Sequence, residues 1–380
     1  MFYITVPQSP VYRQMTLDEL LFSDDIKPII INSNTSNTKT YEVEKISDRF
    51  SDNIEPWKLL SILKNFNEKY EALRNHTPRS DLYYSFHIPK RSGGLRKIDA
   101  PNDDLKIALR ELKEIFETDF KALYHTSAFA YIKKRSTIHA VKRHQQNESK
   151  WFGKFDLSNF FGSTTIDFTL KMLSQIFPFS EVMRYDEGKE AMKDALDLAF
   201  LDGGLPQGTP ISPLLTNIIM IPIDFKLYNG LRDFEKQTFV YTRYADDFLV
   251  SSRYDFDVKK IEKFIVDTLA SFGAPFTINQ KKTRYGSSSG RNWNLGVMLT
   301  KDNTITVGHK KKKQFQTMLA AYIMDNKNGK RWDKSDVQVL EGYRSYFKMV
   351  EGEAIDRMVA HVASKFDVDV VAMIKQDLSN

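Results

Sequence analysis

The stretch Thr238–Ser252, TFVYTRYADDFLVSS, has two runs of β-branched and aromatic residues on either side of Ala245-Asp246-Asp247. Such runs favour strands, so the stretch is predicted to form a β-hairpin with two carboxylates at or beside its turn. Adjacent carboxylates repel each other and would not be chosen for stability. One interpretation is an ordinary solvated acidic turn, which is common. The other is a site for divalent cations such as Mg²⁺, which prefer oxygen ligands and keep open positions for phosphates.

The composition is that of a globular chain. Its 380 residues are enough for a large core and several subdomains, and 41% of them are hydrophobic. No apolar run approaches the roughly 18 residues of a membrane helix, and the N-terminus lacks the pattern of a signal peptide. The absence of cysteine excludes disulfides, thiol catalysis and cysteine-based zinc sites. These features favour a cytoplasmic protein without a membrane partner.

Positive charge is concentrated in two tracts, although the net charge is only +6. Residues 281–313 contain nine Lys or Arg and one acid, and residues 131–154 contain seven Lys or Arg and one acid. Because these cations alternate with Tyr, Phe and Trp, they fit a surface that binds a nucleic-acid backbone. A solvated protein face has a similar composition, so neither tract chooses between the two interpretations alone.

A third acid lies far upstream of the hairpin. Asp156 interrupts an apolar predicted strand, where a carboxylate needs a partner or a metal ion. Phe160 and Phe161 follow it, and they fit either an ordinary core or a bulky ring that excludes a ribose 2′-hydroxyl. If this strand and the hairpin are neighbours in one antiparallel sheet, Asp156, Asp246 and Asp247 converge. Three such acids can hold two Mg²⁺ ions for an in-line phosphoryl displacement.

Two further segments offer contacts for a nucleotide. Residues 84–101 are predicted to form a hairpin with Lys90 and Arg96 on its two arms, which suits a triphosphate, although exposed basic hairpins are usually just soluble. Residues 203–217 are predicted to form a glycine-rich loop leading into an apolar helix. Gln207 lies in this loop, which is either a rigid surface loop or a close ligand contact.

Apolar spacing predicts the remaining elements. Helices are expected over 54–74, 103–123, 166–177, 188–200 and 256–272. In the first helix the stripe expected to face the core consists of Trp57, Leu60, Leu63 and Phe66. A hairpin is expected over 293–307, and the C-terminal region is expected to form helices to about 325, over 336–350 and over 353–376.

Four motifs occur together: the hairpin with Lys90 and Arg96, Asp156 with Phe160 and Phe161, the loop around Gln207, and Tyr244-Ala-Asp-Asp247. In this order and as a set they resemble a reverse transcriptase of the prokaryotic retron, group II intron and defence-associated kind. The resemblance spans about 84–300. It implies an α+β fold of the right-hand polymerase type, with fingers, a palm built on an antiparallel sheet and a small helical thumb. The implied parts are an N-terminal extension and fingers in 1–80, fingers in 81–150, palm in 151–308 with finger helices inserted near 166–200, and thumb in 309–380.

The resemblance also implies roles for individual residues. The catalytic acids are Asp156, Asp246 and Asp247, which together with Leu157 bind the metal, two Mg²⁺ ions with Mn²⁺ as an alternative. The implied nucleotide contacts are Lys90, Arg96, Phe161, Gln207, Gly208 and Lys282, with Phe161 as the 2′-hydroxyl gate. The implied primer-grip turn is Leu295 and Gly296. The basic tracts add to the expected nucleic-acid surface the cations Lys133, Lys134, Arg135, Lys142, Arg143, Lys310, Lys311, Lys312 and Lys313.

The function implied is RNA-directed DNA synthesis from dNTPs, giving a DNA/RNA hybrid. The expected template is a dedicated, structured non-coding RNA in bacterial antiphage defence. The alternatives are an RNA-directed RNA polymerase, a template-independent nucleotide polymerase, and a group II intron maturase or RNA-binding scaffold. Phe161 favours deoxynucleotides, and the intact acids argue against a scaffold. The primer, the oligomeric state and any partner polymerase or effector protein stay open.

Overall fold

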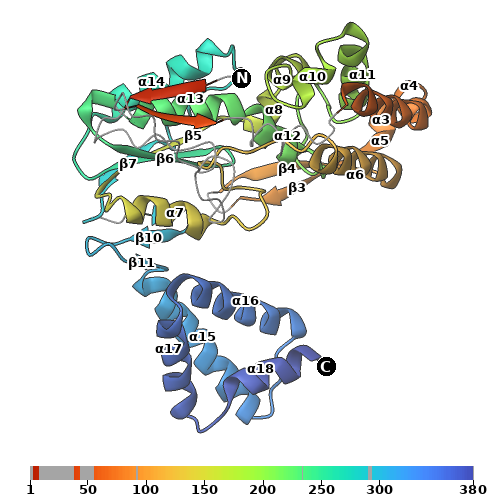
Figure 1. Cartoon of the computed structure of the whole chain (residues 1–380). Helices are drawn as coiled ribbons and strands as arrows, with labels where there is room; N and C mark the ends of the chain where they lie inside the picture. The colour runs from red at the N-terminus through yellow and green to blue at the C-terminus, as the bar shows by residue number, and fades with distance from the viewer. Residues whose placement is uncertain are drawn as a thin grey trace.

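The computed structural model of the chain describes residues 3–7, 38–42, 55–90, 93–232, 234–289 and 293–379. Within these residues α-helices combine with antiparallel sheets, and a helical C-terminal part stands apart from the main body (Figure 1). Most of the predicted N-terminal extension lies outside the described residues. Two strands near the N-terminus, β1 (Tyr3–Pro7) and β2 (Thr38–Glu42), pair with each other. No helix in the described ranges is long and apolar enough to cross a membrane.

The palm is a four-stranded antiparallel sheet in the order β6-β7-β5-β8. Its strands are β5 (Trp151–Asp156), β6 (Phe239–Tyr244), β7 (Asp247–Ser252) and β8 (Arg284–Ser287). Strands β6 and β7 form the predicted hairpin, in which Tyr244 pairs with Asp247 so that Ala245 and Asp246 make the turn. Strand β5 pairs with β7 and places Asp156 directly opposite Asp247. The condition stated above for the three acids to converge, that these segments are neighbours in one antiparallel sheet, is therefore met.

Helices cover both faces of the palm sheet, because successive strand residues point to opposite sides. Helices α13 (Ile221–Arg232) and α14 (Val258–Ser271) lie on one face (Figure 1), where Phe155 and Phe248 join their apolar residues in one core. Helix α7 (Thr137–Gln146) lies on the other face and shares a smaller cluster with Phe152 and Leu249. A short 3-10 turn, η1 (Phe234–Lys236), precedes β6.

The fingers consist of the predicted basic hairpin and a group of helices around a second core. The hairpin strands are β3 (Tyr83–Pro89) and β4 (Leu95–Pro101). The helices are α3 (Pro56–Lys69), α4 (Glu71–Asn75), α5 (Arg79–Leu82), α6 (Asp103–Thr118), α8 (Phe160–Ser163), α9 (Ile166–Leu173), α10 (Phe179–Val182), α11 (Asp186–Asp197) and α12 (Ser212–Ile219).

The core stripe of α3 differs from the prediction. Trp57 is 67% exposed, whereas Leu59, Leu63 and Phe66 are buried. These three residues are spaced i, i+4, i+7 and face the core, so the true stripe begins two residues later on the helix. A large apolar residue in the first turn can remain on the surface when the helix meets its neighbours only further along.

The thumb follows a small three-stranded sheet in the order β11-β10-β9, made of β9 (Trp293–Asn294), β10 (Val297–Leu299) and β11 (Ile305–Thr306). Its helices are α15 (His309–Lys327), α16 (Lys334–Glu351), α17 (Glu353–Ser364) and α18 (Val370–Ser379). The helix predicted over 353–376 is wrong as one piece, since Asp367 has a positive φ of 51° in the turn before α18.

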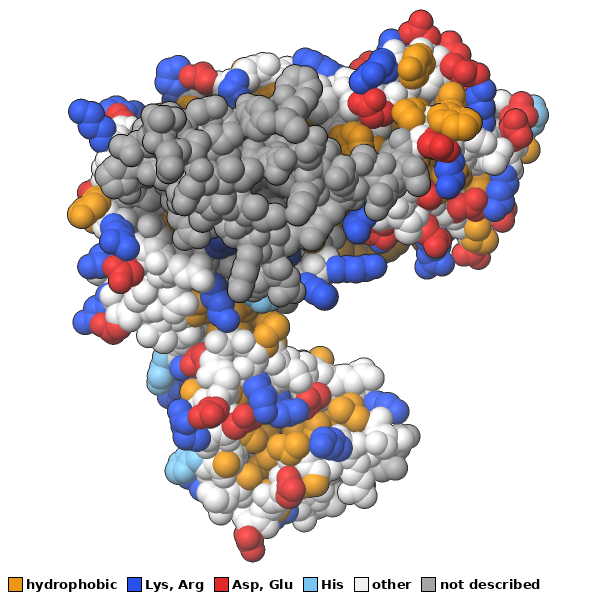
Figure 2. Space-filling view, in the orientation of Figure 1, with side chains coloured by type: hydrophobic (Ala, Val, Ile, Leu, Met, Phe, Trp, Pro, Cys, Tyr) orange, Lys and Arg blue, Asp and Glu red, His pale blue; other side chains and the backbone are white. Residues whose placement is uncertain are grey.

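The whole has the α+β right-hand architecture that the sequence predicts, and we use the names fingers, palm and thumb for the three parts just described. Figure 2 shows a wide concave space between the thumb helices and the fingers, with Lys and Arg side chains along its upper rim. A concave surface of this kind, edged by cations, is suited to a polyanion.

Helix α7 is docked on the palm sheet by His144, whose side chain is fully buried. Its Nδ1 lies 2.6 Å from the hydroxyl of Ser251 on β7, and its Nε2 lies 2.8 Å from the hydroxyl of Thr242 on β6. Burial lowers the pKa of His144 to about 3. The imidazole is therefore neutral in the folded protein at neutral pH.

We expect the free energy of unfolding to fall as the pH is lowered from about 7 to about 5, with His144 causing part of the loss. The unfolded chain binds a proton near the ordinary histidine pKa of about 6.5, whereas the folded chain does not, so acid favours unfolding. His144→Gln should reduce this pH dependence by about 1–2 kcal/mol. Urea unfolding of both proteins at the two pH values measures the difference, and an unchanged pH dependence would contradict the prediction.

Candidate active site

The three acids gather where the central strands end. Asp246 lies in the two-residue turn, Asp247 begins β7, and Asp156 ends β5 opposite it. Ala245 has a φ of 56°, a left-handed conformation that costs a non-glycine residue about 1–2 kcal/mol. Such strain persists only where the surroundings hold it, and it fixes the direction in which Asp246 leaves the hairpin.

Two lysines neutralise part of this negative charge. Lys154 Nζ lies 2.9 Å from Asp247 Oδ2, and Lys282 Nζ lies 2.8 Å and 3.1 Å from the two carboxylate oxygens of Asp156. Asp246 has no comparable partner among the described residues. Burial, and then the charges of Asp247 and Asp156, raise the pKa of Asp246 to about 6. The cluster therefore has an excess of negative charge that a cation would relieve.

The acids suit a divalent metal ion by their chemistry. Carboxylates are the hard oxygen ligands that Mg²⁺ and Mn²⁺ prefer, and Asp247 Oδ1 is buried with no hydrogen-bond partner. In the described ranges no three acidic, histidine or cysteine side chains are already grouped as a metal site. Since Lys282 binds both oxygens of Asp156, metal binding requires its ammonium group to move. Its side chain is 57% exposed and has room to do so.

Leu157, predicted among the metal ligands, can contribute only its main-chain carbonyl because its side chain is buried. Its amide donates to the carbonyl of Asp246 at 3.0 Å, which ties the end of β5 to the hairpin turn. The segment carrying Lys282 is tied to the same place, since the Asn279 amide donates to the Asp156 carbonyl at 2.7 Å. Main-chain hydrogen bonds thus hold the segment that carries Lys282 next to Asp156.

The glycine-rich loop is clamped between α8 and β4. The Leu205 amide donates to the carbonyl of Phe161 at 3.0 Å, and the Asp99 amide donates to the carbonyl of Gln207 at 2.8 Å. A Cβ on Gly208, whose φ is 132°, would lie 2.8 Å from the Asp99 carbonyl oxygen. Only glycine fits such an approach. The structure therefore links the predicted sugar gate, Phe161, directly to the predicted nucleotide loop.

The fingers hairpin carries Lys90 and Arg96 as exposed residues on its two arms. Tyr131, a residue that sequence reasoning missed, lies within electrostatic range of both Arg96 and Asp246. Partial burial and then Asp246 and Tyr244 raise the pKa of Tyr131, while Arg96 lowers it, so the phenol is within electrostatic range of the acids and of this cation. Tyr131 has a positive φ of 59°, which is unusual for a non-glycine residue and often marks a functional site, but no sequence pattern shows it.

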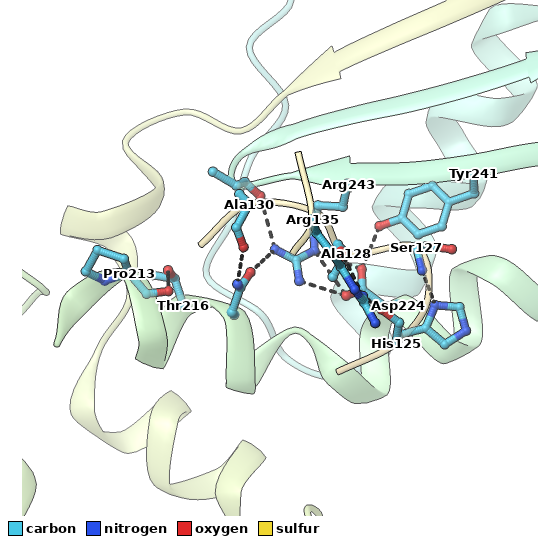
Figure 3. A network of polar contacts seen from close by, with 12 residues as sticks. His125, Ser127, Ala128, Ala130, Arg135, Pro213, Thr216, Asp224, Tyr241 and Arg243 are labelled. Atoms are coloured by element: carbon cyan, nitrogen blue, oxygen red, sulfur yellow. Dashed lines mark hydrogen bonds and ion pairs between the residues drawn. The ribbon is translucent and has the colours of Figure 1, made fainter. Parts of the chain in front are cut away.

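A buried ion pair supports the hairpin from beneath (Figure 3). Arg243 is fully buried, and its Nε and Nη2 donate to both carboxylate oxygens of Asp224 on α13, at 2.7–3.1 Å. Its Nη1 donates to Asn217 Oδ1 at 3.0 Å and to the Ala245 carbonyl at 3.3 Å. The Tyr241 hydroxyl also donates to Asp224, at 2.8 Å. Sequence reasoning missed this network, although a charged residue on the core-facing side of a strand is a signal for it.

The predicted nucleic-acid surface divides into exposed and internally bonded cations. Lys133, Lys134, Lys142, Arg143, Lys310 and Lys313 are exposed, as the prediction requires. Arg135 instead turns inward, and its Nη1 donates to the carbonyls of His125 and Ala128, each at 2.7 Å. Its guanidinium completes the loop before α7, so it does not belong with the surface cations.

The lysine run at the start of α15 divides in the same way. Lys311 Nζ donates to the Gly296 carbonyl at 2.7 Å, and Lys312 Nζ pairs with Glu351 at 2.7 Å. These two are half-buried and already engaged, whereas Lys310 and Lys313 point to solvent. Leu295 and Gly296 form the two-residue turn between β9 and β10, with φ values of 52° and 89°, the pattern of a type I′ hairpin.

Three carboxylates at the end of an antiparallel sheet, with cations and a glycine-clamped loop beside them, form the arrangement of a polymerase palm. The family model "Reverse transcriptase (RNA-dependent DNA polymerase)" matches residues 88–318, more than half of the chain. The chain belongs to this family and is an RNA-directed DNA polymerase. Membership implies an RNA template and a general dependence on divalent metal ions.

Two curated relatives are retron enzymes from Escherichia coli. Retron Ec73 reverse transcriptase is 29% identical over 294 residues, which cover 74% of this chain and 86% of that protein. Retron Ec83 reverse transcriptase is 28% identical over 283 residues, covering 73% and 85%. Among solved structures, telomerase from Candida albicans with a fragment of telomeric RNA is similar with a TM-score of 0.46 and 10% identity, covering 96% of this chain and 74% of that chain.

Arg243→Met should destabilise the protein by about 3–5 kcal/mol, because it leaves the Asp224 carboxylate buried without its partner. The double variant Arg243→Met/Asp224→Asn buries no charge and retains an acceptor for Tyr241, so it should recover much of the loss. Equilibrium unfolding in urea gives both values. A single variant as stable as the wild type, or a double variant no better than the single, would contradict this account of the network.

Proposed function

We propose that the chain synthesises DNA on an RNA template by two-metal nucleotidyl transfer, with Asp156, Asp246 and Asp247 holding Mg²⁺. When bound, the two ions supply Lewis-acid stabilisation to the attacking and leaving oxygens of the in-line displacement. The observation that carries the proposal is the register that sets Asp156 opposite Asp247 with Asp246 in the adjoining turn. Mn²⁺ is a chemically suitable alternative because it takes the same ligands.

The protein's own residues provide positioning and charge. Asp156, Asp247 and the carbonyl of Leu157 would orient the metal, and Asp246 would add the third carboxylate. Lys282, once it leaves Asp156, can interact with the phosphates of the leaving group. Phosphoryl transfer of this kind depends mostly on such positioning and electrostatics, so no protein nucleophile is required.

The incoming dNTP would lie between the palm and the fingers. Lys90 and Arg96 on the exposed hairpin would bind its triphosphate, with Arg offering two parallel donors. Gln207 and Gly208 would approach the nucleotide from the clamped loop. Phe161, half-buried beside that loop, would exclude a ribose 2′-hydroxyl by its bulk.

The nucleic acid would follow the cationic edge of the concave space. Lys133, Lys134, Lys142 and Arg143 would contact it from α7 and the segment before it, and Lys310 and Lys313 from the start of α15. The proposed template is a dedicated, structured non-coding RNA that serves bacterial antiphage defence. This part of the proposal is supported by the motif resemblance described above, and the two relatives named above are retron enzymes by name.

The decisive test compares dNTPs with NTPs as substrates for the purified protein, with and without RNA that co-purifies from the native host. Incorporation of dNTPs that depends on RNA and on a divalent cation supports the proposal. Robust use of NTPs would favour an RNA polymerase, and synthesis without template would favour a nucleotide adder. Sequencing the co-purified RNA identifies the template class, and phage challenge of the host with and without the gene tests the role in defence.

Asp246→Asn combined with Asp247→Asn should abolish DNA synthesis while leaving RNA affinity nearly unchanged, because the proposed RNA surface lies on separate cations. Primer extension and filter binding measure the two properties. Lys310→Gln is a matched control that should weaken RNA binding and spare the chemistry. If the double variant kept the full biological activity, a maturase or scaffold role would replace the catalytic one.

Phe161→Ala should relax discrimination between dNTPs and NTPs, because it removes the ring proposed to meet the 2′-hydroxyl. The measurement is kcat/KM for dGTP and GTP in the wild type and the variant, with Phe160→Leu as the control for a buried neighbour. We expect the selectivity ratio to fall by at least about tenfold, equivalent to about 1.4 kcal/mol. An unchanged ratio would remove the gating role from Phe161.

A further inference from the structure

One buried carboxylate holds the junction between palm and thumb. Glu351, at the end of α16, has a side chain that is 10% exposed. Its Oε1 accepts hydrogen bonds from the Thr306 hydroxyl at 2.7 Å and the Val307 amide at 2.8 Å, and its Oε2 lies 2.7 Å from Lys312 Nζ. These donors belong to β11, to the residue after it and to α15. Glu351 therefore fastens α16 to the segment through which the chain enters the thumb.

The charge on Glu351 is stable in this setting. Burial by itself would raise the pKa of Glu351, but the hydrogen bonds from Lys312, Thr306 and Val307 outweigh it and lower the pKa overall. The ionised Glu351 carboxylate with its three donors holds α16 firmly against β11 and α15, because charge-assisted hydrogen bonds are roughly twice as strong as neutral ones.

The fastened helices meet at the Leu295–Gly296 turn. From α15, Lys311 Nζ donates to the Gly296 carbonyl at 2.7 Å. From α16, the Tyr346 hydroxyl lies 3.6 Å from the position that a Cβ on Gly296 would take. The Tyr346 ring is half-buried and packs on the apolar cluster beneath β10 and β11. Partial burial and then the nearby Tyr244 raise the pKa of Tyr346, so it also lies within electrostatic range of the catalytic hairpin.

The Tyr346 hydroxyl makes no hydrogen bond with any described residue. The hydroxyl of a partly buried tyrosine usually finds a partner, so this donor is available to a ligand. The ligand would lie beside the Gly296 turn, which Lys311 and Tyr346 approach from the two thumb helices. A nucleic-acid strand whose end reaches the acids presents phosphate and sugar oxygens there, and these are hydrogen-bond acceptors.

We propose that Tyr346 donates a hydrogen bond to the sugar–phosphate backbone of the primer strand near its 3′ end, and that Glu351 is the positioning residue that holds Tyr346 in place. The inference rests on the proposed function, because it takes the strand at the Leu295–Gly296 turn to be the primer. In this proposal Lys311 and Lys312 have a structural role: Lys311 binds the Gly296 carbonyl and Lys312 binds Glu351, and together they hold the turn and α16 around Tyr346.

The test measures equilibrium binding of the full chain to a DNA primer annealed to an RNA template, and to the same RNA without primer. Tyr346→Phe keeps the packed ring and removes only the hydroxyl, and Glu351→Gln keeps the acceptor and removes the charge. Each should raise the Kd for the primed hybrid by about three- to tenfold, the effect of one hydrogen bond, and change the Kd for unprimed RNA by less than about twofold. The double variant should be no weaker than the weaker single variant, because both changes act through one contact.

The matched controls are on the same helix. Glu341→Gln breaks an ion pair internal to α16, with Arg344, and Tyr343→Phe removes the hydroxyl of an exposed ring. Both should bind the primed hybrid like the wild type. Equal weakening for unprimed RNA, additive losses in the double variant, or a wild-type Kd for Tyr346→Phe would each overturn the proposal. Failure of the wild type to incorporate dNTPs would instead count against the proposed function, and binding would still be measurable.

Discussion

Mutual repulsion among Asp156, Asp246 and Asp247 is the constraint around which the palm is built. The antiparallel register forces two of these carboxylates to face each other, and the turn adds the third. Lys154 and Lys282 reduce the repulsion at close range. Left to itself the hairpin would relax away from such a contact, so the surrounding structure has to hold it by other means.

The restraint comes mainly from the side of the sheet that carries α13. Arg243 fixes Asp224, Asn217 and the carbonyl of Ala245 at once, so one guanidinium connects two helices to the strained turn (Figure 3). Its main chain also exchanges hydrogen bonds with Ser127 and Phe129, at 2.7 Å and 2.9 Å, which brings the segment before α7 to the same place. Replacing a buried pair of this kind by apolar residues is often harmless to stability. We infer that the Arg243–Asp224 pair instead fixes the position of the Ala245–Asp246 turn, because a fully hydrogen-bonded buried network specifies one geometry.

Much of the palm and the acid cluster could be predicted from the sequence, because β-branched runs around a short turn specify a hairpin whatever the rest of the chain does. A carboxylate in an apolar strand indicated that Asp156 needs a partner, but the pairing of β5 with β7 was only assumed and comes from the structure. The Arg243–Asp224 pair was missed because the two residues lie on different elements, and no local pattern connects them. The roles of Lys311, Lys312 and Arg135 were missed for a related reason. Composition marks a cationic stretch, but only packing decides which cations face solvent and which bond to the protein.

The two lysines beside the acids give the site a particular character. Lys154 and Lys282 pair with two of the three carboxylates, and Asp246 keeps the remaining negative charge of the site. A divalent ion that binds Asp156 has to displace an ammonium group, so its arrival is an exchange of one cation for another. Under the proposed function the same exchange would free Lys282 to interact with phosphates, so metal binding and the release of this cation would be one event.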